Sequence, residues 1–267
     1  MWKEVKVNNW KHFNEIIENF DNNKWIFRGQ SSDKWVLESS LYRECKRFKS
    51  DIDNISCVNI EQKILKEFKS SYKLYSKHQI SEVINSQLVD DWLEERLTTL
   101  SIMQHYGTPT RFLDWTYSPF IAGFFALDGS NDNFCIYALN LNHINSYNLN
   151  HLKIDSSQKN KIFYSTNQSI KPFLYPYDPI EKNQRLRVQQ GLFLVPSLIN
   201  VPFDDVLKEY GIKKGLLNGE ETAIKLIFDK EHLKDWWLRL IQMNITHETI
   251  YPGLEGFCKS LKLNLFK

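Results

Sequence analysis

Helix-like and strand-like segments follow one another irregularly along this chain, and that order limits the folds open to it. Residues 10–20 carry apolar side chains at helical spacing, and a strand-like run over residues 24–28 follows the polar break at residues 21–23. The sequence predicts further helices at about 30–80, 90–106, 119–127 and 230–243, and further strands at 134–141, 191–196 and 222–228. Because this order is no regular β-α alternation, we expect an α+β fold rather than a doubly wound sheet.

Composition and length point to one globular domain. Hydrophobic residues make up 42% of the 267 residues and charged residues 25%, which excludes disordered and fibrous classes. The net charge of +2 is spread along the chain, so no basic arm for nucleic acid is evident. We therefore expect a single domain over residues 1–267.

The four cysteines and the apolar runs indicate where such a protein works. No cysteine forms a CxxC pair, so their spacing predicts neither a zinc site nor a disulfide framework. No apolar run is long enough for a signal region or a membrane span. We expect a soluble cytoplasmic protein without membrane contact and without a metal site.

Polar residues gather in two segments that we expect to form one pocket, Trp25–Gln30 and Gln104–Thr116. Arg28 ends an apolar strand, and its planar guanidinium suits a phosphate or a carboxylate ligand, or else a structural carboxylate. The second segment places many polar side chains between two apolar helices, which is costly unless they pair with one another or with a ligand. Within it, Arg111 and Asp114 are close enough for a structural ion pair, and His105 is either a base or structural.

The residues in these segments resemble the FRG domain, named for its Phe-Arg-Gly motif. The resemblance rests on FRGQ at 27–30, QHYGTPTRFLDWT at 104–116 followed by SPFIAGFFAL, QQGLF at 189–193, and IYPGLEG at 250–256. It covers about residues 18–260 and implies a mainly bacterial or phage-borne family. A long Asn-, Ser- and Pro-rich excursion at 142–182 would carry recognition or gating loops.

A second resemblance is to ADP-ribosyltransferases of the Arg–Ser–Glu type, and it implies a split mixed or antiparallel sheet with flanking helices. Arg28-Gly29 is similar to the first element of that family, residues 114–116 with the helix around 122–126 to the second, and Gln190 to the third. This implies Arg28, Thr116 and Gln190 as catalytic residues. The implied NAD contacts are Arg28, Gly29, Gln30, His105, Tyr106, Trp115 and Phe124, with Trp115 or Phe124 stacking on nicotinamide.

Two departures from that pattern leave alternatives open. The serines are replaced by Asp114 and Thr116, and Gln190 stands where the family has a catalytic Glu, unless Glu220 or Glu221 supplies the carboxylate. A Gln can bind a ribose hydroxyl but cannot act as a base.

Three functions follow as hypotheses. The first is an NAD-dependent mono-ADP-ribosyltransferase, a bacterial toxin or phage-defence effector acting on a protein or nucleic acid and restrained by an antitoxin protein. The second is a non-catalytic module that binds a ligand or nucleic acid. The third is a hydrolase of NAD or nucleic acid with His105 and Asp114 as an acid–base pair.

Overall fold

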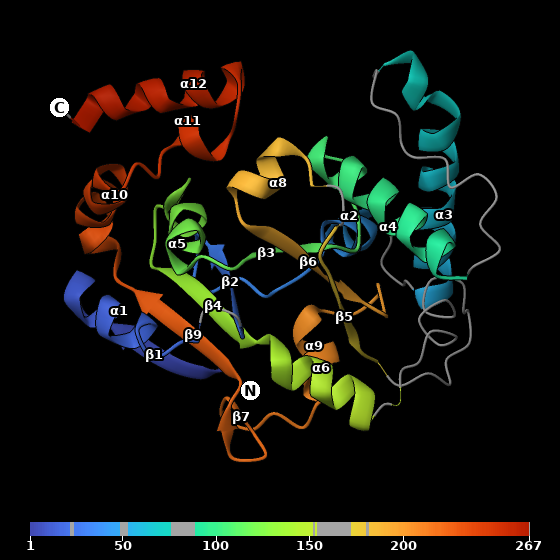
Figure 1. The fold of residues 1–267 in the computed structure, drawn as a ribbon, viewed down its shortest axis with the longest axis horizontal. Coiled ribbons are helices and arrows are strands. Elements are labelled where there is room, and N and C mark those ends of the chain that lie inside the picture. The colour runs from blue at the N-terminus through green and yellow to red at the C-terminus, as the bar shows by residue number, and fades with distance from the viewer. Residues whose placement is uncertain are drawn as a thin grey trace.

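The computed structural model describes residues 1–21, 24–48, 53–75, 89–151, 153, 172–179 and 182–266. Within these ranges a seven-stranded sheet runs in the order β1-β9-β4-β2-β3-β6-β5 (Figure 1). The strands are β1 (Lys3–Val7), β2 (Trp25–Gln30), β3 (Leu113–Thr116), β4 (Phe134–Asn140), β5 (Leu174–Tyr177), β6 (Gly191–Pro196) and β9 (Ala223–Phe228). Only β1 and β9 pair in parallel and all other neighbours are antiparallel, so the sheet is mixed.

Helices flank this sheet along its whole width (Figure 1). They are α1 (Trp10–Ile17), α2 (Ser40–Phe48), α3 (Asn54–Ser71), α4 (Val89–His105), α5 (Pro119–Leu127), α6 (Leu141–Asn150), α8 (Gln184–Val188), α9 (Phe203–Lys208), α10 (Leu233–Gln242), α11 (His247–Ile250) and α12 (Leu254–Ser260). The short elements are η1 (Tyr72–Leu74), η2 (Lys230–His232), η3 (Leu261–Phe266) and the hairpin of β7 (Leu216–Leu217) and β8 (Glu220–Glu221). None of the described helices combines the length and apolar character that a membrane span requires.

Two apolar cores cover the two faces of the sheet, because strand side chains alternate between faces. On one face, α1, α5 and α10 pack on Trp25, Phe27 and the inward residues of β4 and β9. On the other, α4, α6 and α9 pack on Ile26, Trp115 and the inward residues of β6. The mixed sheet with helices on both faces confirms the expected mixed fold class, while likeness to the ADP-ribosyltransferase fold stays a prediction.

The helix α5 illustrates how local sequence fixes an element. Ser118 accepts a hydrogen bond from the backbone N–H of Ile121, and Pro119 occupies the first helical turn, where its missing N–H costs nothing. The helix then lies so close to β2 that a Cβ on Gly29 would stand 1.9 Å from the carbonyl oxygen of Ala122. Gly29 is therefore required by close packing of a helix on a strand.

The pairing of β2 with β3 is limited to one residue pair, Phe27 with Thr116. On its other side β2 pairs with β4 over its whole length, from Trp25 to Gln30. Since ladder pairing between β2 and β3 stops after Phe27, the sheet opens at Arg28 on one strand and at Asp114 on the other. This opening positions the candidate site.

The region 142–182 differs from the expected loop excursion where it is described. Asn140 caps α6 by accepting from the N–H of His143, and α6 buries Leu141, Ile144 and Asn148. The strand β5 then pairs with β6 at the edge of the sheet. Most of the region between these elements, 154–171, lies outside the described residues, and the gating role proposed for it stays a prediction.

Candidate functional site

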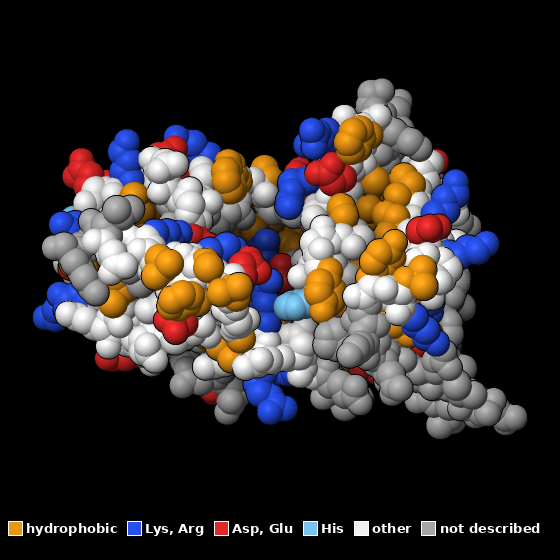
Figure 2. All heavy atoms as spheres, turned by 90° about the horizontal axis from the view of Figure 1, so that it is seen from above, with side chains coloured by type: hydrophobic (Ala, Val, Ile, Leu, Met, Phe, Trp, Pro, Cys, Tyr) orange, Lys and Arg blue, Asp and Glu red, His pale blue; other side chains and the backbone are white. Residues whose placement is uncertain are grey.

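A cavity of about 350 Å³ opens where β2 and β3 separate. Its lining comes from β2, β3, the end of α4, α8 and the C-terminal segment. Residues that line it include Arg28, Gly29, Gln104, His105, Asp114, Trp115, Thr116, Asn183, Arg185, Gln189, Gly191 and Tyr251. Figure 2, which views the molecule from the side of α4, α8 and α12, shows a hollow between two lobes with basic, acidic and histidine side chains in it.

Arg28 spans the opening between the two strands. Its Nη1 donates a hydrogen bond to the backbone oxygen of Asp114 at 2.5 Å, and the Asp114 Oδ2 lies 3.9 Å from the same nitrogen. The Arg28 side chain is 23% exposed, and its buried Nε has no hydrogen-bond partner among the described residues. Burial lowers the pKa of Arg28, and the charge of Asp114 partly opposes that shift. A buried donor without a partner is rare in folded proteins, so this nitrogen is held at a cost to stability.

Asp114 is the only carboxylate among the described side chains that line the cavity. It is 58% exposed, so the Arg28–Asp114 pair is open to the cavity rather than sealed in the core. Its Oδ2 accepts a hydrogen bond from Gln104 Nε2 at 2.9 Å. The carboxylate is thus held between an amide and a guanidinium, and it faces the cavity.

Thr116 joins β3 to the loop that follows α8. Its hydroxyl donates to the backbone oxygen of Gln189 at 2.7 Å and accepts from the N–H of Ser118 at 3.0 Å. With both roles of the hydroxyl used and only 3% of the residue exposed, Thr116 supports the wall.

The third wall is built from α8 and the C-terminal segment. Gln189 Nε2 donates to the backbone oxygen of Ile250 at 3.2 Å, which ties α8 to α11. The Arg185 guanidinium lies 4.6 Å from the centre of the Tyr251 ring, and the Lys259 ammonium 4.8 Å from it. Burial raises the pKa of Tyr251 to about 12, so this hydroxyl stays protonated at neutral pH.

Gln190, expected as a catalytic residue, does not line the cavity, whereas its neighbour Gln189 does. Gln190 is exposed and has a φ of 47°, because the chain turns between α8 and β6 at this residue. Glu220 and Glu221 are also outside the lining, since both are exposed on β8 and Glu221 pairs with Lys3. The carboxylate near Arg28 is therefore Asp114.

The remaining predicted contacts divide between cavity and core. His105 lines the cavity, but Tyr106 does not, and its ring meets the His105 ring edge-on at 4.8 Å. Trp115 lines the cavity although only 2% of it is exposed, and its ring packs against Phe203. Phe124 is fully buried against Trp237 and His247, and Phe125 lines the cavity in its place. Gln30 is half-buried outside the lining.

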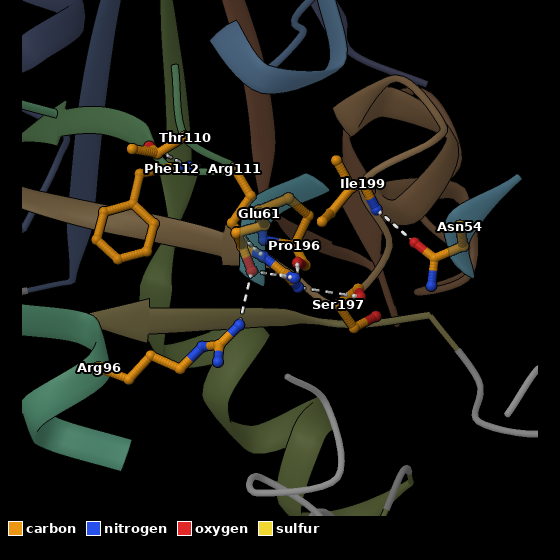
Figure 3. Close-up of polar contacts among 9 residues, drawn as sticks. All are labelled: Asn54, Glu61, Arg96, Thr110, Arg111, Phe112, Pro196, Ser197 and Ile199. Carbon is orange, nitrogen blue, oxygen red and sulfur yellow. Dashed lines mark hydrogen bonds and ion pairs between the residues drawn. The ribbon is translucent and has the colours of Figure 1, made fainter. Parts of the chain in front are cut away.

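Arg111 is structural, but its carboxylate partner is Glu61 rather than the expected Asp114. Two nitrogens of Arg111 donate to the two oxygens of Glu61 at 2.7 Å each, and Arg96 donates to the same carboxylate at 3.1 Å (Figure 3). Both Arg111 and Glu61 are buried. Burial alone would raise the pKa of Glu61, but the two arginines outweigh it and hold this pKa below its usual range.

Comparison with known families identifies the segment that carries most of these residues. Residues 23–134 match the model of the FRG domain. Over these residues the chain is similar to the FRG domain. No curated protein matches the chain, and neither does any solved structure.

The FRG domain match contains only part of the site. It begins just before β2, includes β3 and α5, and ends at Phe134, the first residue of β4. Arg28, His105 and Asp114 lie inside it, but Arg185 and Tyr251 of the third wall lie outside it. The cavity is therefore completed by residues beyond the FRG domain match.

The sequence did not predict the roles of three residues, Arg185, Tyr251 and Glu61. Arg185 lies just before the QQGLF segment and Tyr251 lies within IYPGLEG, yet nothing local indicates that these two side chains meet. Glu61 carries no local signal at all, because it lies on α3, remote in sequence from Arg111.

Proposed function

We propose that the cavity binds NAD as a substrate and transfers its ADP-ribosyl group to an acceptor. The observation that carries the proposal is Arg28: a cationic fork, held at one nitrogen by β3 and 23% exposed, that lines a cavity of substrate size. Such a fork suits a phosphate oxygen, and a second cation, Arg185, lines the same cavity. A volume of about 350 Å³ is at the lower end for small-molecule sites and suits the nicotinamide ribose half of a dinucleotide.

The chemistry assigns distinct tasks to the chain. In the reaction, an acceptor atom bonds to the ribose carbon, nicotinamide leaves with the bonding electron pair, and the acceptor loses a proton. Positive charge develops on the ribose as the old bond breaks, and the Asp114 carboxylate can stabilise it electrostatically. His105, on the same cavity, is the described side chain best suited to take the acceptor proton. Trp115, Phe125 and Tyr251 provide an apolar surround for a planar ring.

A macromolecular acceptor would make the protein a toxin or phage-defence effector, and we include that role in the proposal. It would act in the cytoplasm, where NAD and such acceptors are found, and an antitoxin protein would restrain it. Induced expression in a bacterial host, with the Arg28→Ala variant as the inactive comparison, tests this part. Growth arrest by the wild type and normal growth with the variant are expected.

The decisive experiment follows labelled NAD. The purified protein is incubated with a lysate and NAD labelled in the adenylate part, and label is counted in protein and nucleic acid after protease or nuclease treatment. Transfer is expected from the wild type and from Arg47→Ala, an exposed arginine on α2, but not from Arg28→Ala. Thermal unfolding checks that both variants are folded. If NAD is not consumed and does not raise the melting temperature, the proposal is wrong.

Hydrolysis is a second candidate function. His105 and Asp114 line one cavity, so an acid–base pair and water as acceptor are available there. Release of free ADP-ribose and nicotinamide without label in macromolecules would favour this function. Binding of NAD without consumption would instead identify a non-catalytic module.

A further inference from the structure

Gln104 connects the cavity carboxylate to a buried threonine. Its Oε1 accepts a hydrogen bond from the Thr110 hydroxyl at 2.6 Å, and its Nε2 donates to Asp114 Oδ2 at 2.9 Å. Gln104 lies in the last turn of α4, and Asp114 lies on β3. The amide therefore couples a helix end to the strand that borders the cavity.

The direction of these hydrogen bonds is set at Thr110. The Thr110 hydroxyl accepts from the backbone N–H of Phe112 at 3.1 Å, so its own hydrogen is available for Gln104 Oε1. Because Oε1 is held by this donor, the NH₂ end of the amide must face Asp114. The orientation of Gln104 is thus determined by its neighbours rather than by free rotation.

Thr110 is itself held in place from the start of α2. The Ser40 hydroxyl accepts from the Thr110 N–H at 3.0 Å and donates to the Thr110 carbonyl at 3.1 Å. The N–H of Leu41 donates to the same carbonyl at 2.9 Å. Thr110 is fully buried, so it is a rigid base for the amide.

We propose that Gln104 is a positioning residue that orients Asp114 for reaction. Its NH₂ group donates to Oδ2, which fixes the orientation of the carboxylate and leaves Oδ1 for the substrate. Arg28 Nη1 lies 3.9 Å from the same Oδ2. This inference rests on the proposed function, in which Asp114 stabilises positive charge on the ribose.

Substitutions that remove one hydrogen-bond donor between Thr110, Gln104 and Asp114 test the inference. Gln104→Glu keeps the acceptor for Thr110 but has no hydrogen to donate, so two carboxylates face each other and share a proton. We expect kcat to fall about tenfold with little change in KM, and the acid limb of the pH–rate profile to move to higher pH. A rise in KM or a loss of folded protein at unchanged kcat would instead indicate a purely structural role for Gln104.

Thr110 offers a matched pair of variants. Thr110→Val removes the hydroxyl at nearly constant shape, and we expect kcat to fall by about the same factor as in Gln104→Glu. Thr110→Ser keeps the hydroxyl and should retain the rate of the wild type. If Thr110→Val and Gln104→Glu both keep the wild-type kcat and pH–rate profile, the inference is overturned.

A measurement independent of activity separates this inference from the proposed function. Hydrogen exchange of the Gln104 side-chain amide, followed by NMR, should be slow in the wild type and in Thr110→Ser, and faster in Thr110→Val. A wild type that never consumes NAD but shows this pattern refutes the proposed function while the positioning of Asp114 stands. Equal exchange in all three proteins refutes the positioning itself.

Discussion

Arg28 and Asp114 meet across the opening between β2 and β3, where a guanidinium nitrogen donates to a backbone oxygen in place of a ladder hydrogen bond. The side chain that closes the strand gap is therefore the side chain that the cavity presents to a ligand. Structure and proposed binding depend on the same planar group.

The planar shape of the Arg28 guanidinium should matter for ligand binding as well as its charge. We expect Arg28→Lys to weaken binding of ADP-ribose at least about tenfold, because an ammonium cannot hold the Asp114 oxygen and a phosphate in one plane. Isothermal titration calorimetry of wild type, Arg28→Lys and Arg28→Ala measures this. Binding by Arg28→Lys that equals the wild type would show that a point charge suffices.

Gly29 and Gly123 provide a test of the packing of α5 on β2. Gly29→Ala should lower the free energy of unfolding by at least about 3 kcal/mol, because the new Cβ would collide with the backbone of Ala122 and Ala126. In Gly123→Ala the Cβ would stand 3.8 Å from Ile136 Cδ1, an ordinary contact, and the helix should gain roughly 0.5–1 kcal/mol. Urea unfolding of both variants measures these two changes in stability. Similar midpoints would mean that α5 does not lie this close to β2.

The buried Glu61 should be among the most sensitive positions of the fold. Glu61→Gln removes the charged carboxylate that pairs with both Arg111 and Arg96, and we expect the free energy of unfolding to fall by about 3–5 kcal/mol. Glu67→Gln, on the exposed side of the same helix α3, should change stability by less than about 0.5 kcal/mol. Chemical denaturation compares the two, and an equal effect would contradict the assignment of Glu61 as the ionic centre.

Stability should fall on acidification for a defined reason. Burial alone would raise the pKa of Glu61 and Asp128, but the two arginines at Glu61, and His247 and Lys262 at Asp128, hold both values below the usual range. The unfolded chain therefore takes up these protons first as the pH falls. The stabilisation is complete above about pH 4.5 and is lost as the pH falls through the folded values.

Urea midpoints measured from pH 6 to pH 3 should trace this loss. Glu61→Gln should show a shallower decline than the wild type, because one of the two linked groups is gone. Parallel declines would indicate that other carboxylates govern the acid limit.

The thiols should differ sharply in reactivity. Cys258 is exposed, whereas Cys45, Cys57 and Cys135 are buried. Burial raises the pKa of both Cys57 and Cys135 to about 12, so neither forms the reactive thiolate at neutral pH. A chromogenic disulfide reagent should modify one thiol per folded chain and all four in denaturant. Rapid modification of Cys45 or Cys57 as well would show that the helices α2 and α3 open readily.

Sequence patterns predicted helices α1, α4, α5 and α10, four of the seven strands of the main sheet and two of the three cavity walls, because these depend on local spacing. The period of apolar residues located α1, α4 and α5, and the alternation in residues 25–30 located β2. Arg28 and residues 104–116 were correctly expected to share a pocket, since so many polar groups in apolar surroundings need partners.

The parts that could not be predicted are set by register and by distant contacts. Gln189 rather than Gln190 reaches the cavity because Gln190 is itself the turn residue with positive φ, and its side chain is exposed. Phe125 rather than Phe124 does so because neighbouring positions on a helix point about 100° apart. Glu61 pairs with Arg111 across 50 residues of sequence, and no local pattern specifies such a partner.

The strand order also decides when during synthesis the cavity can exist. In the sheet, β2 lies between β4 and β3, and β4 pairs on its other side with β9. Tyr251 completes the third wall of the cavity. Arg28 therefore leaves the ribosome long before the residues that complete its surroundings, and the nascent chain has no finished site until the last strand and α11 have emerged. Any activity that depends on this cavity begins only after Tyr251 has emerged, so shorter nascent chains are inert.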